Sequence, residues 1–367
     1  MSDNTVSASF HPFTLAILRW YESHARQLPW RASRDPYAIW LSEVILQQTR
    51  IQQGWAYWER FMRRWPTVGQ LAAATEDEVL REWQGLGYYS RARHLHQAAR
   101  QIAARGAFPD TYDGIRSLKG VGDYTAAAIA SIAFGLPVAA VDGNVYRVLA
   151  RYFAIDTPIN TTAGKREFGS LAQSLLPMGR ASAFNQAMMD FGSLQCTPQS
   201  PSCDLCPLVE SCGAYRSARV GELPVKLRKM QVRERHLTYY YIRHEGCVAI
   251  HRRGEGDIWQ GLWEPFLIER DAGASVADVS VPDFAGLPVG SLDTGRLTLL
   301  RQGVRHVLTH RVLWADFYLW EPVTRPELPP DFIWINESDI GQYALPRLVE
   351  MMVEAVGLYF TKSDHLN

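Results

Sequence analysis

Between Phe13 and Phe191, apolar residues recur every three or four positions, which is the period of a helix with one buried face. Prolines and glycines interrupt this pattern at intervals and divide it into segments of helical length. The pattern predicts helices over 37–60, 90–105, 124–134 and 145–153. Period-two alternation is rare in this region, so we expect an all-α domain.

Beyond about residue 236 the pattern changes to short runs of β-branched and aromatic residues separated by turn signals. These runs, followed by a final helical segment at 345–358, predict an α+β domain of about 125 residues. A polar, basic stretch at 222–235 predicts a linker between the two domains. The predicted strands are 236–243, 247–252, 304–309, 312–320 and 332–335.

The composition is that of a soluble protein: 47% of the 367 residues are hydrophobic and 21% are charged. The apolar stretch 13–18 is too short for a secretory signal, and glycine and proline break the uncharged run 125–141. We therefore expect a cytoplasmic protein. Its net charge of zero conceals an asymmetry, because residues 1–230 carry +6 and the remainder carries −6. A basic half suits binding to a polyanion such as nucleic acid. The basic residues of the chain are mostly arginine and not lysine, and this preference also fits a GC-rich genome.

Four of the five cysteines form a compact C-x6-C-x2-C-x5-C array, namely Cys196, Cys203, Cys206 and Cys212. In a reducing compartment, clustered thiols favour a metal centre over disulfides. Zinc and an iron–sulfur cluster both accept four thiolates. The single CxxC and the surrounding prolines favour a [4Fe–4S] cluster slightly. Cys247 lies outside the array and reads as a small core residue.

Lys119, Gly120, Val121 and Gly122 precede a predicted helix. Two glycines around one aliphatic residue turn the chain sharply and leave N–H groups free at the helix start. Such a nest binds a phosphate without reading sequence, whereas the alternative is a plain turn between helices.

Two carboxylates suggest catalysis. Glu43 has mainly apolar helical neighbours, so burial would raise its pKa, as a general acid requires. Asp142 begins a predicted helix, and capping would keep it ionised. One protonated and one ionised carboxylate can break a glycosidic bond through an oxocarbenium-like state. The simpler readings are a solvated Glu43 and an Asp142 that only caps.

Aromatic residues accompany arginines at 28–31 and, with flexible glycines, at 85–91. Flat rings beside guanidinium groups can stack on unpaired bases. For Trp30, core packing is an equally reasonable interpretation.

Together these residues resemble the MutY-type adenine DNA glycosylases of the endonuclease III superfamily, and the resemblance covers nearly the whole chain. It rests on Leu28–Arg31, Ser42–Thr49, Gly85–Tyr89, Leu118–Ala126, Val141–Val145 and the cysteine array. It implies a base-excision repair enzyme that removes adenine opposite 8-oxoguanine or guanine in duplex DNA. It also implies a [4Fe–4S] cluster, a monomer and a nucleoid-associated cytoplasmic location.

The resemblance also implies a division of the chain. A helix–hairpin–helix glycosylase domain would span 1–221, with a six-helix module at 28–133 and a cluster-bearing module at 1–27 plus 134–221. After the linker 222–235, a Nudix-like 8-oxoguanine recognition domain would span 236–360, and 361–367 would be a tail.

By the same resemblance, Glu43 protonates adenine at N7 and Asp142 stabilises the sugar cation, with assistance from Tyr124 and Asn144. Gln48 and Tyr88 would wedge into the base stack, and Thr49 and Leu86 would touch the oxidised guanine. The remaining implied contacts are those of the flipped-base pocket, which are Arg26, Trp30, Arg31, Leu46 and Asp190.

Endonuclease III resembles this chain at the hairpin but has a lysine, its Schiff-base nucleophile, where this chain has Tyr124. The resemblance therefore implies a monofunctional glycosylase, with Lys119 as a phosphate contact. The alternatives are a bifunctional glycosylase/lyase acting on oxidised pyrimidines and a non-catalytic iron–sulfur DNA-binding module.

The C-terminal half resembles the family's Nudix-like domain at 261–264 and 306–310. It has no Glu-rich Nudix helix, so nucleotide hydrolysis is not expected. The family's Phe-Ser-His loop, which inspects 8-oxoguanine, is matched by Leu308, Thr309 and His310. Leucine cannot stack as phenylalanine does, while threonine keeps the hydroxyl and histidine the imidazole.

Overall fold

The computed structural model describes residues 10–227, 233–270 and 295–364, and the chain divides into two compact units. The first unit is drawn from residues 1–73 and 94–228, and the second from 74–93 and 229–367. An all-α part followed by an α+β part confirms the predicted fold class. Within the described ranges, no helix is long and apolar enough to cross a bilayer.

The predicted domain limits stay predictions, but two segments differ from expectation. Strand β1 begins at Arg233, inside the predicted linker, and helix α13 continues to Asp364, inside the predicted tail. Residues 228–232 of that linker and 365–367 of that tail lie outside the described residues.

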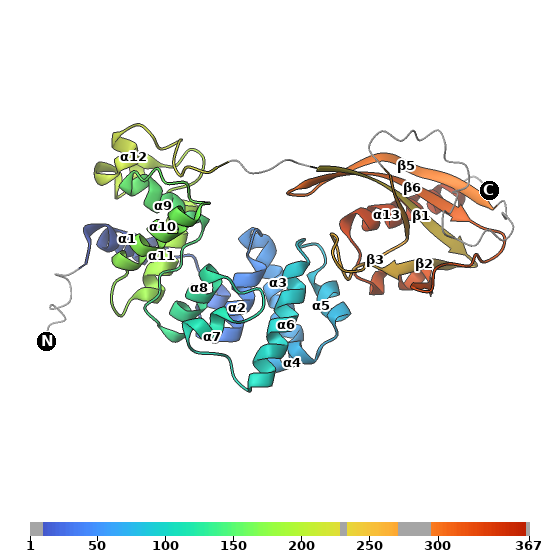
Figure 1. Ribbon diagram of the computed structural model, residues 1–367, viewed down its shortest axis with the longest axis horizontal. Helices are drawn as coiled ribbons and strands as arrows, with labels where there is room; N and C mark the ends of the chain where they lie inside the picture. Colours follow the sequence, from blue (N-terminus) through green and yellow to red (C-terminus); the bar gives the residue numbers. More distant parts are fainter. Residues whose placement is uncertain (1–9, 228–232, 271–294, 365–367) are drawn as a thin grey trace. The chain divides into compact units, whose positions relative to one another are not determined.

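Helices make up the first unit, and Figure 1 shows them in order along the chain. They are α1 (Pro12–His24), η1 (Pro29–Arg31), α2 (Pro36–Ile45), α3 (Ile51–Arg64), α4 (Val68–Ala73), α6 (Ser90–Arg105), α7 (Tyr112–Arg116), α8 (Asp123–Phe134), α9 (Gly143–Phe153), α10 (Thr162–Leu175), α11 (Ala181–Leu194), η2 (Cys203–Leu205), η3 (Val209–Ser211) and α12 (Gly213–Arg216). The first four residues of α6 belong to the second unit, together with α5 (Glu76–Trp83).

The single helix predicted over 37–60 is wrong, because the chain leaves the helix between α2 and α3. Gln48 adopts a left-handed conformation with φ 56° in this break. Gly54 then lets α3 approach the turn, since a Cβ on it would lie only 2.6 Å from Leu46 Cδ2. Apolar periodicity continues across the break, so the pattern could not reveal it.

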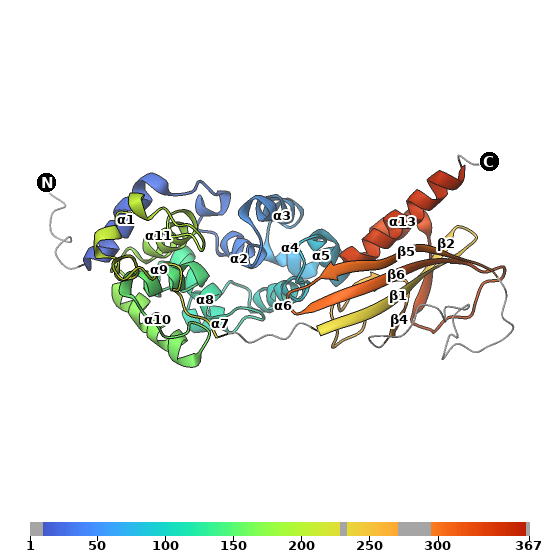
Figure 2. The ribbon, with the colours of Figure 1, turned by 90° about the horizontal axis from the view of Figure 1, so that it is seen from above.

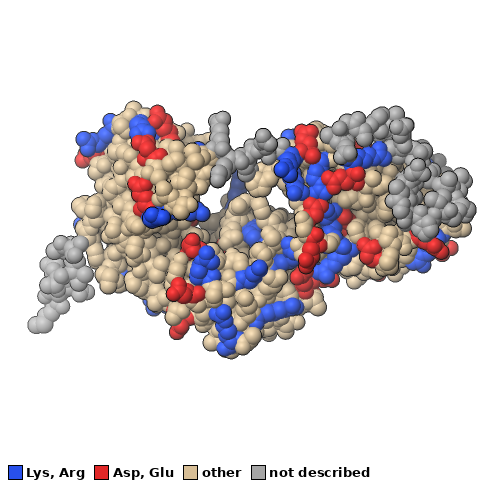
Figure 3. Space-filling view, in the orientation of Figure 1, with Lys and Arg blue, Asp and Glu red and all other residues tan. Residues whose placement is uncertain are grey.

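The core of this unit lies between α1, α9, α10 and α11, where Ile17, Leu149, Phe168 and Phe184 are buried. Helix α11 contacts α1, α8 and α9 and thereby links the two ends of the unit. On the face drawn in Figure 3, basic side chains lie over α6, which contributes Arg100 and Arg105 to the first unit.

The second unit contains a seven-stranded sheet in the order β3-β2-β1-β6-β5, with β4 paired to β1 and β7 paired to β2. Strands β1 and β6 are parallel, and the other pairs are antiparallel. The strands are β1 (Arg233–His244), β2 (Cys247–Arg252), β3 (Trp263–Glu264), β4 (Phe266–Arg270), β5 (Arg296–Val307), β6 (Arg311–Glu321) and β7 (Phe332–Asn336).

The central strand β1 is buried on both faces, so Tyr239 and Tyr240 belong to different clusters. Helix α13 (Arg347–Asp364) packs Leu348 and Met352 into the Tyr239 cluster and contacts β5, and it runs alongside the sheet in Figure 2. The 3₁₀ segment η5 (Glu337–Gln342) leads towards this helix. Cys247 is only half-buried at the start of β2, so its predicted place in the core is wrong.

Candidate active site

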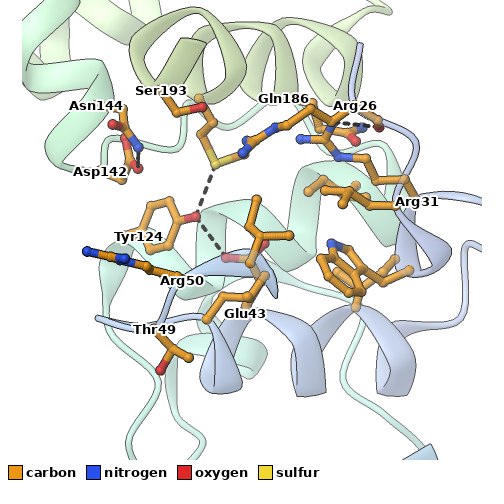
Figure 4. Close-up of a pocket in the computed structure, with 17 residues that line it drawn as sticks. Arg26, Arg31, Glu43, Thr49, Arg50, Tyr124, Asp142, Asn144, Gln186 and Ser193 are labelled. Carbon is orange, nitrogen blue, oxygen red and sulfur yellow. Dashed lines mark hydrogen bonds between the residues drawn. The ribbon is translucent and has the colours of Figure 1, made fainter. Parts of the chain in front are cut away.

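A cavity of about 300 Å³ opens in the first unit. Figure 4 shows side chains from several separate elements meeting around it. Its lining comprises Arg26, Leu28, Trp30, Arg31, Ile39, Glu43, Leu46, Thr49, Arg50, Ile51, Tyr124, Ile132, Asp142, Asn144, Gln186, Met189 and Ser193. Elements far apart in the sequence therefore bring both predicted catalytic carboxylates to one cavity.

Glu43 reaches this cavity from the last turn of α2, between the buried residues Ser42 and Val44. The Tyr124 hydroxyl, at the start of α8, donates a hydrogen bond of 2.8 Å to Glu43 Oε2. Burial raises the pKa of Glu43 to about 7, with Asp142 adding to the rise while Tyr124 and Arg31 oppose it. A carboxyl group with this pKa can hold a proton near neutral pH and donate it.

Asp142 is the N-cap of α9. Its Oδ1 accepts the Val145 backbone N–H at 2.8 Å, and its Oδ2 accepts the Asn144 side-chain amide at 2.7 Å. The expectation that capping alone sets its charge omitted desolvation. Burial raises the pKa of Asp142 above its ordinary value, although Val145, Asn144 and Arg147 all act in the opposite direction.

Helix α11 holds Asn144 in place by close contact. A Cβ on Gly192 would lie 2.6 Å from Asn144 Cβ, so only glycine allows α11 to approach the start of α9 this closely. Arg147 ties the same two elements together, because its guanidinium donates to Asn144 Oδ1 at 2.8 Å and to the Gly192 carbonyl.

Asp190 does not line the cavity, contrary to the expectation, because its side chain is fully buried on α11. It accepts two hydrogen bonds from Arg31, at 2.7 and 2.8 Å, and others from Arg26. Burial raises the pKa of Asp190, but hydrogen bonds from Arg31 and Arg26 outweigh this effect and leave the pKa below its ordinary value. Asp190 thus holds two arginines that do line the cavity.

Trp30 also lines the cavity although it is 95% buried, with its ring edge-to-face against Trp55 and Trp58. Trp30 is therefore part of the cavity wall and also part of the packed core. Gln48 is exposed in the turn after α2 and lies outside the lining, whereas its neighbour Thr49 belongs to it.

The Lys119–Gly122 hairpin precedes α8, but its two glycines have different roles. Gly120 has φ 75° and faces His94 so closely that a Cβ would lie 2.6 Å from it. Gly122 has an ordinary φ of −90° and is an N-cap without a side-chain hydrogen bond. Val121 is buried, and its backbone N–H donates to the Leu118 carbonyl. Lys119 is exposed, and its backbone N–H donates to Gln101 Oε1, so the hairpin presents one cation at its surface.

The four clustered cysteines carry no disulfides and line one small cavity. Arg151 borders it, donating to the Thr197 carbonyl at 2.7 Å and to Cys196 Sγ at 3.4 Å. Arg147 binds the Cys196 carbonyl at 2.7 Å, which joins this loop to α9. Among the described residues, no group of three or more possible ligands is arranged to hold a single metal ion.

The second unit has a larger cavity, of about 680 Å³, next to the loop after β5. The predicted recognition residues Leu86, Tyr88, Leu308, Thr309 and His310 all line it. The hydroxyls of Tyr88 and Thr309 are hydrogen bonded to each other. Leu308 packs against the core, while the preceding Val307 is 56% exposed. The exposed apolar side chain beside this loop is therefore that of Val307, the last residue of β5, and not that of Leu308.

Several lining residues were not predicted from the sequence. Arg50, Gln186, Met189 and Ser193 border the first cavity, and Trp259 borders the second. Arg50 directly follows the motif 42–49, so its position next to this motif could have identified it as a lining residue. Met189 lies in an apolar helical pattern, where nothing distinguishes a cavity wall from a core residue.

Two family models match the chain. One describes the HhH-GPD superfamily of base excision DNA repair proteins and matches residues 41–173, and the other describes a NUDIX domain and matches residues 238–355.

The individual relatives are named adenine DNA glycosylase. An adenine DNA glycosylase of Buchnera aphidicola is 33% identical over 255 residues, covering 68% of this chain and 72% of the relative. The mouse and human adenine DNA glycosylases are 43% and 44% identical over 222 residues, which is 58% of this chain. The chain thus matches only 43% and 41% of the length of these mammalian relatives.

A solved thermostable thymine-DNA glycosylase is 31% identical, with a TM-score of 0.53 over 56% of this chain and 95% of that protein. A trapped endonuclease III–DNA covalent intermediate is 24% identical, with a TM-score of 0.50 over 56% of this chain and 94% of that protein, and shares the fold.

Proposed function

Because the chain belongs to the adenine DNA glycosylase family, we propose that it hydrolyses the N-glycosidic bond of adenine mispaired with 8-oxoguanine or guanine in duplex DNA. The observation that carries this proposal is the meeting of Glu43, Tyr124 and Asp142 around one cavity. Such a cavity suits a base that has left the helical stack.

Glu43 acts as the general acid. With a pKa raised to about 7, it carries a proton in a substantial fraction of molecules at neutral pH. Transfer of that proton to adenine N7 makes the base a better leaving group. Arg26 and Arg31, held by Asp190, line the same cavity and orient the base.

Asp142 acts on the sugar. As the C1′–N9 bond breaks, positive charge develops on the deoxyribose ring, and an ionised carboxylate stabilises it. The hydrogen bonds from Val145 and Asn144 fix the carboxylate of Asp142 and favour its charged form. Water then attacks C1′, which leaves an abasic site in an uncut strand.

The proposed reaction is monofunctional. Tyr124 occupies the position at the start of α8 where an amine would form a Schiff base. None of the described residues that line the cavity is a lysine. Lys119 lies on the exposed hairpin and contacts a backbone phosphate in this proposal, together with the N–H groups of Gly120 and Gly122.

Recognition of the opposite base belongs to the second unit. Thr309 and His310 offer hydrogen-bonding groups to 8-oxoguanine, and Tyr88 and Leu86 line the same cavity. The exposed Val307 takes over the apolar contact that Leu308, packed against the core, does not offer.

Cys196, Cys203, Cys206 and Cys212 hold a [4Fe–4S] cluster in this proposal. The fit rests on four free thiols around one cavity with Arg151 donating to Cys196 Sγ. The cluster would supply covalent cross-links to a loop that has only short helices of its own.

Replacing Glu43 by glutamine tests the acid. The variant keeps its volume but has no proton to transfer, so single-turnover release of adenine from an A:8-oxoguanine duplex should fall by roughly 10²-fold or more. Binding of the duplex should be retained. The matched control is Glu167→Gln, an exposed position on α10 outside the cavity.

Base release at the wild-type rate from Glu43→Gln would contradict the acid assignment. Strand scission by the wild-type protein without alkali would instead support a glycosylase/lyase.

A further inference from the structure

The Tyr124 hydroxyl has two partners in the cavity. It lies 2.8 Å from Glu43 Oε2 and 3.1 Å from the sulfur of Met189 on α11. Figure 4 shows both contacts as dashed lines that meet at the Tyr124 oxygen. Met189 is largely buried and lines the cavity, so its sulfur faces the reaction space and not only the core.

A hydroxyl group has one proton to donate and can accept through its lone pairs. When Glu43 is ionised, the Tyr124 proton points to the carboxylate. When Glu43 is protonated on Oε2, that O–H can donate to the Tyr124 oxygen, and the Tyr124 proton then needs another acceptor. A thioether sulfur is a weak acceptor, but it is the partner that the structure provides.

We propose that Met189 is a positioning residue for catalysis, whose sulfur accepts the Tyr124 proton when Glu43 is protonated on Oε2 and so holds on Glu43 the proton that the reaction consumes. This inference rests on the proposed general-acid role of Glu43. Without the sulfur, protonation at Oε2 would leave the buried Tyr124 O–H without this acceptor, at a free-energy cost.

The other groups that act on Glu43 come from different elements. They are Tyr124 on α8, Asp142 at the start of α9 and Arg31 in η1. Helix α11 contributes Met189, while Asp190 next to it is neutralised by Arg26 and Arg31. Replacement of Met189 therefore leaves every charged group around Glu43 unchanged.

Met189→Leu is the direct test, because leucine has nearly the same volume and no acceptor. We expect the alkaline limb of the pH–rate profile for single-turnover adenine release to move to lower pH by roughly half a unit. Titration of the ¹³C-labelled Glu43 carboxyl by NMR in the DNA-free enzyme should show the same displacement. This second readout does not depend on turnover.

Two further variants complete the test. Met188→Leu makes the same change at the neighbouring buried position, which does not line the cavity. It should leave the midpoint pH of the alkaline limb and of the Glu43 titration unchanged. Met189→Gln restores an acceptor oxygen and should bring the midpoint to the wild-type value or above, which also decides the matter if the leucine variant does not fold.

An unchanged midpoint in Met189→Leu, an equal displacement in Met188→Leu, or a lowered midpoint in Met189→Gln would each overturn the role of Met189. Failure of the wild-type enzyme to release adenine would overturn the proposed function instead, and the NMR titration would still decide the inference.

Discussion

At the scale of single residues, the surroundings of a carboxylate determine its chemistry more than its residue type does. Glu43 and Asp142 are both carboxylates whose pKa is raised by burial, whereas the pKa of Asp190, also buried, lies below its ordinary value because two arginines bind it. The sequence indicated Glu43 through its apolar helical neighbours. It could not show that Asp190 lies behind the cavity wall, since the partners that neutralise Asp190 are 159 and 164 residues away.

These pKa shifts predict a bell-shaped pH–rate profile. The rate should fall as the pH rises through about 7, because Glu43 loses the proton that it must donate. It should also fall on the acid side as Asp142 becomes protonated, at a pH above the ordinary value of 3.8 because burial raises that pKa. Single-turnover rates across the pH range measure both limbs. A rate that increases through pH 7 would contradict the assignment of Glu43.

At the scale of elements, the helices bounded by clear stop signals were predictable. Helix α8 ends at Gly135 in a left-handed conformation, and α9 begins at the capping residue Asp142. The break between α2 and α3 was not predictable, because it depends on the contact of Leu46 with the backbone at Gly54. Strands β3 and β4 were not predicted, because β3 has only two residues and β4 shows no regular alternation of burial.

Gly192 on α11 provides a test at this scale. Gly192→Ala places a methyl group 2.6 Å from Asn144 Cβ, so the helices must separate. We expect a loss of roughly 1–3 kcal/mol in unfolding free energy and a lower rate of adenine release, because Asn144 holds Asp142. The control is Gly169→Ala in α10, where nothing lies within 4 Å of the added Cβ. Chemical denaturation and single-turnover kinetics measure the two effects. Equal behaviour of the two variants would contradict this account.

At the scale of the whole molecule, the proposed function assigns a different part of mispair recognition to each unit. The first unit holds the cavity proposed for the excised base, and the second holds the cavity lined by Tyr88 and Thr309. The change from helical period to alternation predicted this organisation from the sequence. The shift of the exposed apolar residue from 308 to 307 was not predictable, because it depends on how the loop after β5 packs on its core.

Thr309→Val tests this division. Valine keeps the shape of threonine but cannot hydrogen bond to Tyr88 or to an oxidised base. We expect the ratio of single-turnover rates on A:8-oxoguanine and A:guanine duplexes to fall several-fold, with the rate on A:guanine nearly unchanged. Thr298→Val, at the other end of β5, is the matched control. An unchanged ratio would remove Thr309 from recognition.

The pairing of Arg26 and Arg31 with Asp190 also bears on how the enzyme responds to ionic strength. Dissolved counterions weaken interactions between exposed charges, but they have little access to a carboxylate with no solvent-exposed surface. Exposed arginines that grip the sugar–phosphate backbone would lose affinity as salt is added. The wall of the base cavity would keep its form. A high salt concentration would therefore weaken binding of the substrate but leave the arrangement of the side chains around the cavity unchanged.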